Sequence, residues 1–405
     1  MPLTPDINQV RTWFPALASE FAYLENAGGS QVPGTVADAI CGYMTSSYVQ
    51  LGAGYAQSLR ASATVEAAHA FMETFMNAQG LGKIVLGPST TALSHILAGA
   101  YGETVKPGDE FIIAETSHES NAGPWEKLKS RGAVVHVWKV DPETFECSLE
   151  SLRALLNERT RIVAFPHVSN ILGQIVDVPA IVQLVHSVGA KVVVDGVAYA
   201  PHHAIDVAAW GVDWYVFSAY KVYGPHMAVL FGRTEAFAEI VGPNHFFIPA
   251  NSVPHKFELG GISHEACAGL LALRPYLQFL AGRHVDDRET IVKAFQVMER
   301  LEAPPARRLV EYLRSKPGVR LIGAQGTDSV GTVSFVFAGK SSAAIVAEVD
   351  RHPLGIRYGH MYAYRLVTAL GIPPEDGVVR VSVVHYNTLA EIERLIAVFE
   401  TVLTH

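Results

Sequence analysis

A lysine and an aspartate stand at the ends of two neighbouring apolar runs, and these residue types could do amine chemistry. Lys221 follows "WYVFSAY" (214–220), and Asp195 ends "KVVVD" (191–195). Desolvation lowers the pKa of a lysine, so that its neutral amine can attack a carbonyl carbon. A half-buried aspartate needs a cation or a hydrogen-bond donor beside it. Each residue also has an ordinary explanation: a solvated lysine at a strand end, and an aspartate that caps a helix or forms a salt bridge.

A second candidate is the segment "LGPSTTALSHI" (86–96), in which Thr90 and Thr91 stand between an apolar run and a helix-like run. Free backbone N–H groups at the start of a helix, together with Ser and Thr hydroxyls, suit a phosphate group. The same pattern is typical of an ordinary Ser or Thr N-cap. The pattern alone leaves both interpretations open.

Three further polar residues lie at the ends of predicted strands or inside them. His118 follows the run at 110–116 and could stack on a planar ring, although a lone histidine is more often structural. Asn170 follows the run at 161–168, where a turn asparagine is the more ordinary interpretation. Arg380 lies inside an apolar run and, if buried, must pair with a protein carboxylate or a substrate carboxylate.

The joint placement of these residues is more informative than each residue alone. An amine after one strand, an anion after the preceding strand and a phosphate-type helix start upstream predict a site for pyridoxal phosphate. In that arrangement Lys221 carries the aldehyde, and Asp195 keeps the pyridine nitrogen protonated. The helix start holds the phosphate.

The runs that must position these residues alternate with helix-like segments. Seven short apolar runs, rich in β-branched and aromatic residues, predict strands at 83–87, 110–116, 133–140, 161–168, 191–197, 214–220 and 227–232. This alternation predicts an α/β domain with a mainly parallel, seven-stranded sheet. The link at 221–226 is too short for a crossover helix, so the last strand should be antiparallel to its neighbour. Ligands of open α/β sheets bind at the carboxyl ends of strands, where the candidate residues lie.

The last part of the chain predicts a smaller α+β domain. "HEACAGLLALRPYLQFLAG" (264–282) predicts one long apolar helix, and "EAPPARR" (302–307) predicts a loop or a helix start. Thr388 and Glu391 have capping-box spacing, which predicts a final helix. The predicted domains are 15–287 (large) and 288–405 with 1–14 (small).

Composition argues against several classes of protein. The 405 residues carry a net charge of −8 without a Lys/Arg cluster, so nucleic-acid binding is not expected. Because no apolar run approaches the roughly 20 residues of a membrane helix, no membrane span is expected. The N-terminus lacks the pattern of a signal peptide, and we expect a cytoplasmic protein. The three cysteines (Cys41, Cys147 and Cys267) are far apart, and no ligand cluster predicts a metal site.

The sequence resembles the class V aminotransferase family of pyridoxal-phosphate enzymes, and most of all its cysteine desulfurase-like branch. The resemblance spans nearly the whole chain and rests on "YLENAGGSQVP" (23–33), "HVSNILGQIVDV" (167–178), the Asp195 and Lys221 blocks, and "VRVSVVHYNTLAEI" (379–392). It implies the fold-type-I architecture of PLP-dependent transferases. It also implies a homodimer with sites at the subunit interface, in which "ELGGISHE" (258–265) reaches the neighbouring site.

The resemblance also implies roles for individual residues. The expected catalytic residues are the Schiff-base lysine, the ring-stacking histidine and the partner of the pyridine nitrogen, which match Lys221, His118 and Asp195. The expected cofactor-binding residues are these three with Asn170, Thr90, Thr91, Ser218 and Tyr220, and Asn121 lies behind the histidine. The expected substrate-binding residues are Arg380, Arg357 and Asn170.

Three positions depart from the family pattern. Tyr362 stands where the desulfurases carry their nucleophilic cysteine, Tyr220 where relatives often have histidine, and Ala198 where glutamine is usual. Without a thiolate at position 362, the usual persulfide route has no acceptor.

We therefore predict a PLP-dependent enzyme that acts on an amino acid through an external aldimine and a Cα carbanion. It would be an aminotransferase or a desulfurase-like lyase that cleaves C–S bonds or performs β-elimination. An amino-acid epimerase of the same family and a non-catalytic PLP-binding protein stay open as alternatives. A nicotinamide dehydrogenase would need a GxGxxG segment after a first strand, which the sequence lacks.

Overall fold

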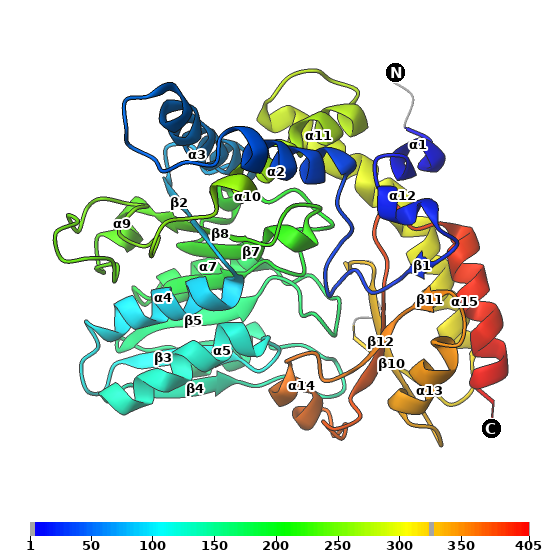
Figure 1. The fold of residues 1–405 in the computed structure, drawn as a ribbon. Helices are drawn as coiled ribbons and strands as arrows, with labels where there is room; N and C mark the ends of the chain where they lie inside the picture. Colours follow the sequence, from blue (N-terminus) through cyan, green and yellow to red (C-terminus); the bar gives the residue numbers. More distant parts are fainter. Residues whose placement is uncertain (1–4, 324–327, 405) are drawn as a thin grey trace.

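The computed structural model describes residues 5–323 and 328–404, and its largest sheet has seven strands (Figure 1). These strands are β2 (Gly82–Gly87), β3 (Glu110–Ala114), β4 (Val134–Trp138), β5 (Thr160–Pro166), β6 (Lys191–Asp195), β7 (Trp214–Ser218) and β8 (Ala228–Arg233). Their order is β2-β8-β7-β6-β5-β3-β4, and β8 is antiparallel to both of its neighbours while the other pairs are parallel. The predicted sheet, including its antiparallel last strand, is confirmed.

Helices cover both faces of this sheet because its strands are apolar on both faces. In β3, Ile112 lies in the apolar cluster that α3 (Ala56–Phe75) joins. The preceding residue, Phe111, lies in a second cluster with α4 (Thr90–Gly102) and α5 (Glu119–Glu126). Successive side chains of a strand point to opposite faces, so a continuous apolar run builds both cores at once.

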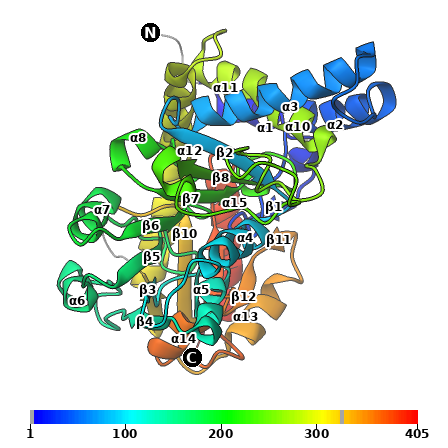
Figure 2. The same cartoon turned by 90° about the vertical axis from the view of Figure 1, so that its left-hand side faces the viewer.

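A four-stranded antiparallel sheet lies beside the large one (Figures 1 and 2). Its strands in order are β12 (Arg357–Gly359), β13 (Val378–Ser382), β10 (Thr332–Phe337) and β9 (Val319–Ile322). The helices α13 (Ser342–Val349) and α15 (Leu389–Val402) share an apolar cluster with it. α15 begins with the predicted capping box, in which Thr388 and Glu391 bond reciprocally. The smaller α+β region is therefore confirmed.

One helix, α12 (Arg288–Ser315), runs through both regions. Phe295 in its first half packs into the core of the large sheet, and Leu313 in its second half packs into the core of the small sheet. The predicted loop or helix start at 302–307 is wrong, because the helix continues through Pro304 and Pro305. Packing at both ends outweighs the cost of an interior proline, about 3 kcal/mol. The domain boundaries at 287/288 and 14/15 stay a prediction, since α12 contributes to both cores.

The single helix predicted at 264–282 is also wrong. The segment forms α10 (His264–Leu271) and α11 (Arg274–Ala281), with Pro275 in the first turn of α11. Proline is tolerated in a first helical turn, where no partner for its missing N–H is needed, so a new helix can begin beside Pro275. The apolar pattern continued across the break, so periodicity alone could not locate it.

Shorter elements complete the described chain. They are α1 (Ile7–Arg11), α2 (Gly34–Ser46), α6 (Leu149–Leu155), α7 (Val178–His186), α8 (Val207–Trp210), α9 (Thr234–Phe237), α14 (Tyr364–Ala369), the parallel pair β1 (Ala22–Tyr23) and β11 (Leu354–Gly355), and 3₁₀ turns at Pro15–Ala18, Lys127–Arg131 and Ala219–Lys221. Within residues 5–323 and 328–404, no helix combines the length and apolar character that a bilayer crossing requires. The cytoplasmic location stays a prediction.

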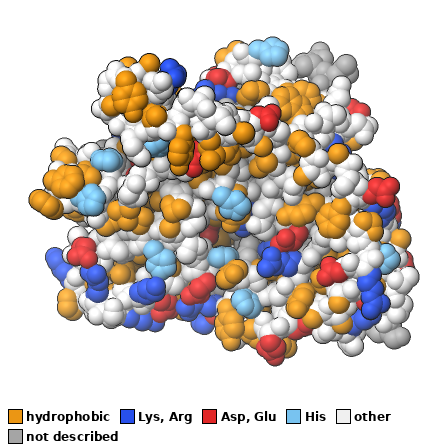
Figure 3. All heavy atoms as spheres, in the orientation of Figure 1, with side chains coloured by type: hydrophobic (Ala, Val, Ile, Leu, Met, Phe, Trp, Pro, Cys, Tyr) orange, Lys and Arg blue, Asp and Glu red, His pale blue; other side chains and the backbone are white. Residues whose placement is uncertain are grey.

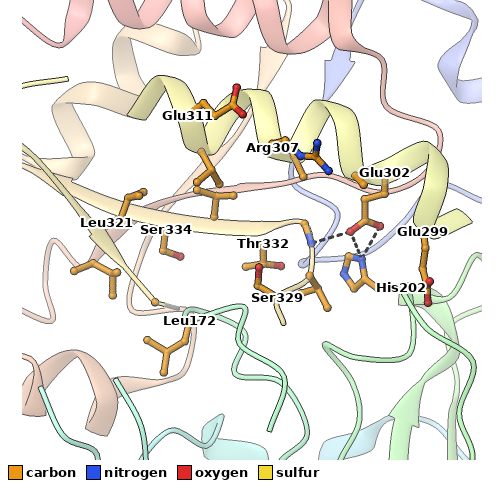
Figure 4. A pocket seen from close by; sticks show the side chains of 18 of the residues that line it. Leu172, His202, Glu299, Glu302, Arg307, Glu311, Leu321, Ser329, Thr332 and Ser334 are labelled. Atoms are coloured by element: carbon orange, nitrogen blue, oxygen red, sulfur yellow. Dashed lines mark hydrogen bonds and ion pairs between the residues drawn. The ribbon is translucent and has the colours of Figure 1, made fainter. Parts of the chain in front are cut away.

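A cavity of about 630 Å³ lies between α12 and the strands β9 and β10, away from the predicted site residues (Figure 4). Glu302 of α12 is buried at its wall. Its carboxylate lies 2.7 Å from Nδ1 of the buried His202 and accepts a hydrogen bond of 2.8 Å from the Gly331 backbone N–H. This carboxylate joins α12 to a large-domain loop and to the small sheet.

The substitution Glu302→Ala is expected to lower the free energy of unfolding by about 3 kcal/mol, because it leaves two buried donors without their acceptor. Chemical denaturation monitored by circular dichroism measures the change. Glu299→Ala is the matched control, since Glu299 lies one turn earlier on α12 and pairs with His203 at the surface. The control is expected to cost less than about 1 kcal/mol. Equal losses of stability in Glu302→Ala and Glu299→Ala would contradict the role of Glu302 as a buried acceptor.

Candidate active site

A cavity opens at the carboxyl edge of the large sheet, where several strands end. The residues that line it are Ser89, Thr90, Thr91, His118, Ser120, Pro166, Val168, Asn170, Asp195, Val197, Ala198, Ser218, Tyr220 and Lys221. All eight residues predicted to bind the cofactor are among them. The structure thus brings them together, as expected for the carboxyl ends of neighbouring strands. Their individual roles stay predictions.

Lys221 lies on the 3₁₀ turn that follows β7, three residues beyond the end of the strand. Its Nζ sits 5.8 Å from the centre of the Tyr220 ring, and that ring stacks on His226. Burial, reinforced by the positive charge of Arg380, lowers the pKa of Lys221 to about 8, although Asp195 opposes the shift. An amine with this pKa is partly neutral at physiological pH and can act as a nucleophile or a base.

The turn after Lys221 is held in an unusual backbone conformation. Tyr223 has a φ of 62°, in the left-handed region that non-glycine residues rarely adopt. Its backbone N–H donates to Ser30 Oγ at 2.9 Å, and its hydroxyl donates to Pro201 O at 2.8 Å. These bonds to separate parts of the chain fix the turn, and with it the direction of the Lys221 side chain.

Asp195 is the last residue of β6 and is almost fully buried. One of its oxygens accepts a hydrogen bond of 3.0 Å from the Val197 backbone N–H. Burial raises the pKa of its carboxyl group to about 6, against the lowering effects of that N–H and of Lys221. The shift means that the buried anion is incompletely compensated by the chain itself. A cationic N–H donor entering the cavity would stabilise it.

The start of α4 contributes backbone N–H groups and hydroxyls to the cavity wall. Ser89 is the N-cap and accepts a hydrogen bond from the Ala92 backbone N–H, so capping does not use the hydroxyls of Thr90 and Thr91. Thr90 Oγ1 instead lies 2.7 Å from Ser218 Oγ at the end of β7. The two interpretations of this segment are therefore compatible: one residue caps the helix, and the next residues face the cavity.

His118 caps α5 and faces the cavity. Its Nδ1 accepts a hydrogen bond of 3.0 Å from the Ser120 backbone N–H, which assigns the ring proton to Nε2 in the neutral form. Burial, with smaller effects of Lys221 and Arg380, lowers the pKa of His118 to about 4. The imidazole is thus neutral at physiological pH, as a stacking ring can be. Behind the His118 ring, the side-chain amide of the fully buried Asn121 has no hydrogen-bond partner among residues 5–323 and 328–404.

Asn170 links the cavity to the small sheet. Its side-chain amide donates to Met361 O at 2.8 Å, and its backbone oxygen accepts from Arg380 Nη1 at 3.2 Å. Its side-chain oxygen is buried and has no partner within the described part of the chain. An acceptor of this kind is available to a ligand in the cavity.

The two predicted substrate arginines lie beyond Asn170, outside the set of residues that line the cavity. Arg380 is buried on β13, and Arg357 is exposed on β12. Sequence reasoning left open whether Arg380 pairs with a protein carboxylate, and the structure identifies one. Glu25 Oε1 lies 3.6 Å from Arg380 Nη2 and 3.3 Å from Arg357 Nη1. Glu25 was missed, although it lies in the block 23–33 that carried part of the resemblance.

The aminotransferase class-V family matches residues 22–395 of the chain. The chain belongs to the class-V aminotransferase family. Among the relatives of this class-V protein is an aminotransferase-like protein, FGM3, from Gibberella zeae, which is 40% identical over 98% of each chain. A cysteine desulfurase from Salmonella agona is 30% identical, again over 98% of each chain. The cysteine desulfurase-like character predicted from the sequence is thereby confirmed.

Solved structures show the same fold as this class-V protein. The cysteine desulfurase from Thermococcus onnurineus superposes with a TM-score of 0.88 at 26% identity, covering 100% of this chain and 99% of that one. The cysteine desulfurase CsdA from Escherichia coli superposes with a TM-score of 0.83, also at 26% identity and over 99% of each chain. The predicted fold-type-I architecture is confirmed.

Proposed function

We propose that the protein is a pyridoxal-phosphate enzyme that acts at the Cα of an amino acid, as an aminotransferase or as a lyase that eliminates a β-substituent. One observation carries the proposal: Lys221 and Asp195 face a single cavity, and burial shifts their pKa values toward neutrality from opposite sides. A pair shifted in this way is typical of a functional site. Membership in the class-V family supports the same conclusion.

The residues of the cavity fit pyridoxal phosphate. The hydroxyls of Thr90, Thr91 and Ser218, with the backbone N–H groups at the start of α4, would hold the phosphate. The undercompensated carboxylate of Asp195 would hold the protonated pyridine nitrogen, and His118 would lie against the ring. Bound pyridoxal phosphate withdraws electrons from the Cα–H bond of an amine joined to its aldehyde carbon.

The chain's own residues would then bind the substrate and move its proton. Arg380 would receive the α-carboxylate, because its Nε is buried without a partner in the described residues. Lys221 Nζ would accept the Cα proton and return it to another atom of the substrate or cofactor. His118, neutral at physiological pH, would exclude water from one face of the site.

Persulfide chemistry is a less favoured alternative for this chain. Tyr362, which the resemblance predicts at the position of the desulfurase cysteine, lies with its ring centre 5.3 Å from that of His118. Burial raises the pKa of Cys147 to about 11 and that of Cys267 to about 12, so neither is a thiolate at physiological pH. Cys41 is exposed on α2, outside the cavity. These observations favour transamination or elimination over sulfur transfer to the protein.

Absorption spectroscopy of the purified protein tests the proposal. Addition of pyridoxal phosphate should give a cofactor band, and single amino acids should change that band. The products then separate the reactions, since a keto acid without ammonia indicates transamination, a keto acid with ammonia or sulfide indicates elimination, and the opposite enantiomer indicates epimerisation. A colourless protein that does not respond to the cofactor would overturn the proposal. A band that no amino acid changes would favour a non-catalytic cofactor-binding protein.

The rate at which the apoprotein captures pyridoxal phosphate is expected to rise with pH and to level off above about pH 8. Only the neutral amine of Lys221 attacks the aldehyde, and the amine is mostly protonated below its pKa of about 8. Stopped-flow absorbance between about pH 6 and about pH 9.5 measures the profile. A rate that still rises steeply at the top of this range would indicate an ordinary, solvated lysine.

We also propose a cytoplasmic homodimer. Two groups of large apolar side chains are exposed, one on α2, α3 and the loop between them and one after α9, where orange side chains gather in Figure 3. The first includes Tyr48 and Leu59, and the second includes Phe246, which is 97% exposed, and Phe247. Exposed apolar patches mark interaction surfaces. Sedimentation equilibrium tests the dimer, and a monomer at micromolar concentration would contradict it.

A further inference from the structure

Two arginines of the small sheet share one carboxylate at the edge of the proposed substrate site. Arg357 on β12 and Arg380 on β13 are directly opposite each other in the antiparallel pair. Like charges in this position repel each other. Glu25 Oε1 lies within 3.6 Å of a guanidinium nitrogen of each arginine, so a single anion faces both cations.

The fold fixes Glu25 in this place. Its backbone forms a parallel bridge with Ser382, the last residue of β13, which lies two residues from Arg380. A Cβ atom at position 28 would lie 2.2 Å from Glu25 Oε1, so a side chain at that position would displace the carboxylate from its present place. The Glu25 side chain is 20% exposed, whereas Arg357 is 57% exposed and Arg380 only 3%. The carboxylate therefore stands between a buried arginine and an exposed one.

The two arginines are not equally available to a ligand. Arg380 is buried, its Nη1 bonds to Asn170 O, and its Nε has no partner in the residues that the structure describes. Arg357 approaches Glu25 more closely, at 3.3 Å against 3.6 Å. The neighbouring groups Lys221 and Asp195 carry opposite charges and largely offset each other. The net charge at this end of the site is thus one positive charge, not two.

We propose that Glu25 determines the substrate class by neutralising Arg357, so that the site accepts amino acids with a single carboxylate and discriminates against those with a second, side-chain carboxylate. The inference rests on the proposed function, because it assumes that Arg380 receives the α-carboxylate. With Glu25 in place, a second substrate carboxylate meets an anion instead of a free guanidinium. Without Glu25, Arg357 is a free cation that can bind this second carboxylate in a bidentate pair.

Binding of two unreactive acids of equal length to the holoenzyme tests the proposal. The probes are butyrate, with one carboxylate, and succinate, with two, and calorimetry or the shift of the cofactor band gives each Kd. In the wild type, butyrate should bind at least as tightly as succinate. In Glu25→Gln, succinate should bind about tenfold more tightly, and butyrate should change by less than about threefold.

A second variant restores the original charge. The double variant Glu25→Gln with Arg357→Gln removes one anion and one cation, so it should return the preference to butyrate. Glu348→Gln is the matched control, because Glu348 forms a surface ion pair with Arg351 on α13, outside the site. It should leave both Kd values unchanged. Should Glu25→Gln fail to fold, Glu25→Asn supplies the test, since it removes the same anion and leaves Arg357 in place.

Several outcomes would overturn the inference. The first is an equal tightening of both acids in Glu25→Gln, and the second is no change in the Kd of either acid in that variant. The third is a double variant that keeps the preference for succinate. A wild-type protein that takes up no pyridoxal phosphate would overturn the proposed function and the inference with it. A holoenzyme that binds both acids but ignores Glu25 would overturn the inference alone.

Discussion

The substitution Lys221→Ala is expected to abolish covalent attachment of pyridoxal phosphate and to reduce turnover by about 10⁴-fold. Lys221 has a pKa lowered to about 8 by burial and lies in the cavity with Asp195 and His118. No other lysine lines that cavity in the described chain. Sodium borohydride treatment followed by mass spectrometry measures the attachment, since reduction fixes the cofactor only where an amine carries it.

A lysine on the same sheet provides the control for this prediction. Lys191 begins β6 at the opposite edge and pairs with Asp213 and Glu239. Lys191→Ala should keep covalent attachment and turnover and should change only the stability. If the cofactor is still fixed by borohydride in Lys221→Ala, a different amine carries it, and the proposed role of Lys221 is wrong.

The substitution Asp195→Asn is expected to have opposite effects on activity and on stability. Turnover should fall by about 10³-fold, because a neutral amide does not keep the pyridine nitrogen protonated. The apoprotein should nevertheless become more stable above about pH 6, by about 3 kcal/mol. Urea unfolding of the apoprotein at several pH values, together with turnover of the holoenzyme, measures both effects.

The sign of the stability change follows from the raised pKa. The folded state binds the proton of Asp195 more tightly than the unfolded state, because burial raises the pKa from 3.8 to about 6. The carboxyl group therefore destabilises the fold increasingly as the pH rises from about 4 to about 6, and the loss is complete above that range. Asparagine cannot ionise and removes this cost. At low pH, where the carboxyl group is protonated in both states, the variant should gain nothing.

A second buried aspartate gives a control with the opposite expected sign. Asp213 is as buried as Asp195, but it pairs with His186 and Lys191 and accepts a hydrogen bond from the Val192 backbone N–H. Asp213→Asn should lower the stability by about 2 kcal/mol, because it leaves these partners uncompensated. If Asp195→Asn instead lowers the stability at pH 8, the expected gain is wrong. The protein itself would then compensate the negative charge of Asp195.

The large sheet and most of the cavity could be predicted because they depend on local pattern. Strands that are buried on both faces appear in the sequence as short apolar runs, and neighbouring parallel strands end at the same edge of the sheet. Asp195 ends one strand and Lys221 follows the next strand. Their proximity was therefore predictable from the order of the apolar runs alone. The turn that actually carries Lys221 was not, because its 3₁₀ geometry depends on bonds to distant residues such as Ser30.

The remaining errors concern interactions between segments that are distant in sequence. Glu25 meets Arg380 only because the N-terminal segment lies beside β13, and no local pattern records that pairing. The helix through Pro304 and Pro305 contradicts local propensity, because its two halves pack into different cores. The sequence alone predicts that Arg380, if buried, needs an anionic partner. Only the tertiary fold identifies that partner as Glu25.

The path of α12 has a mechanical consequence for the site. Lys221 belongs to the large sheet, whereas Arg380 belongs to the small sheet, and α12 is anchored in the cores of both. The distance between the Lys221 amine and the Arg380 guanidinium therefore depends in part on the curvature of this helix, beside the hydrogen bonds that join Asn170 to Met361 and Arg380. Pro304 and Pro305 each lack a backbone N–H between the two anchored halves, so this is where the helix bends most easily. We expect the stiffness of α12 at these two prolines to influence how closely Lys221 and Arg380 approach a substrate.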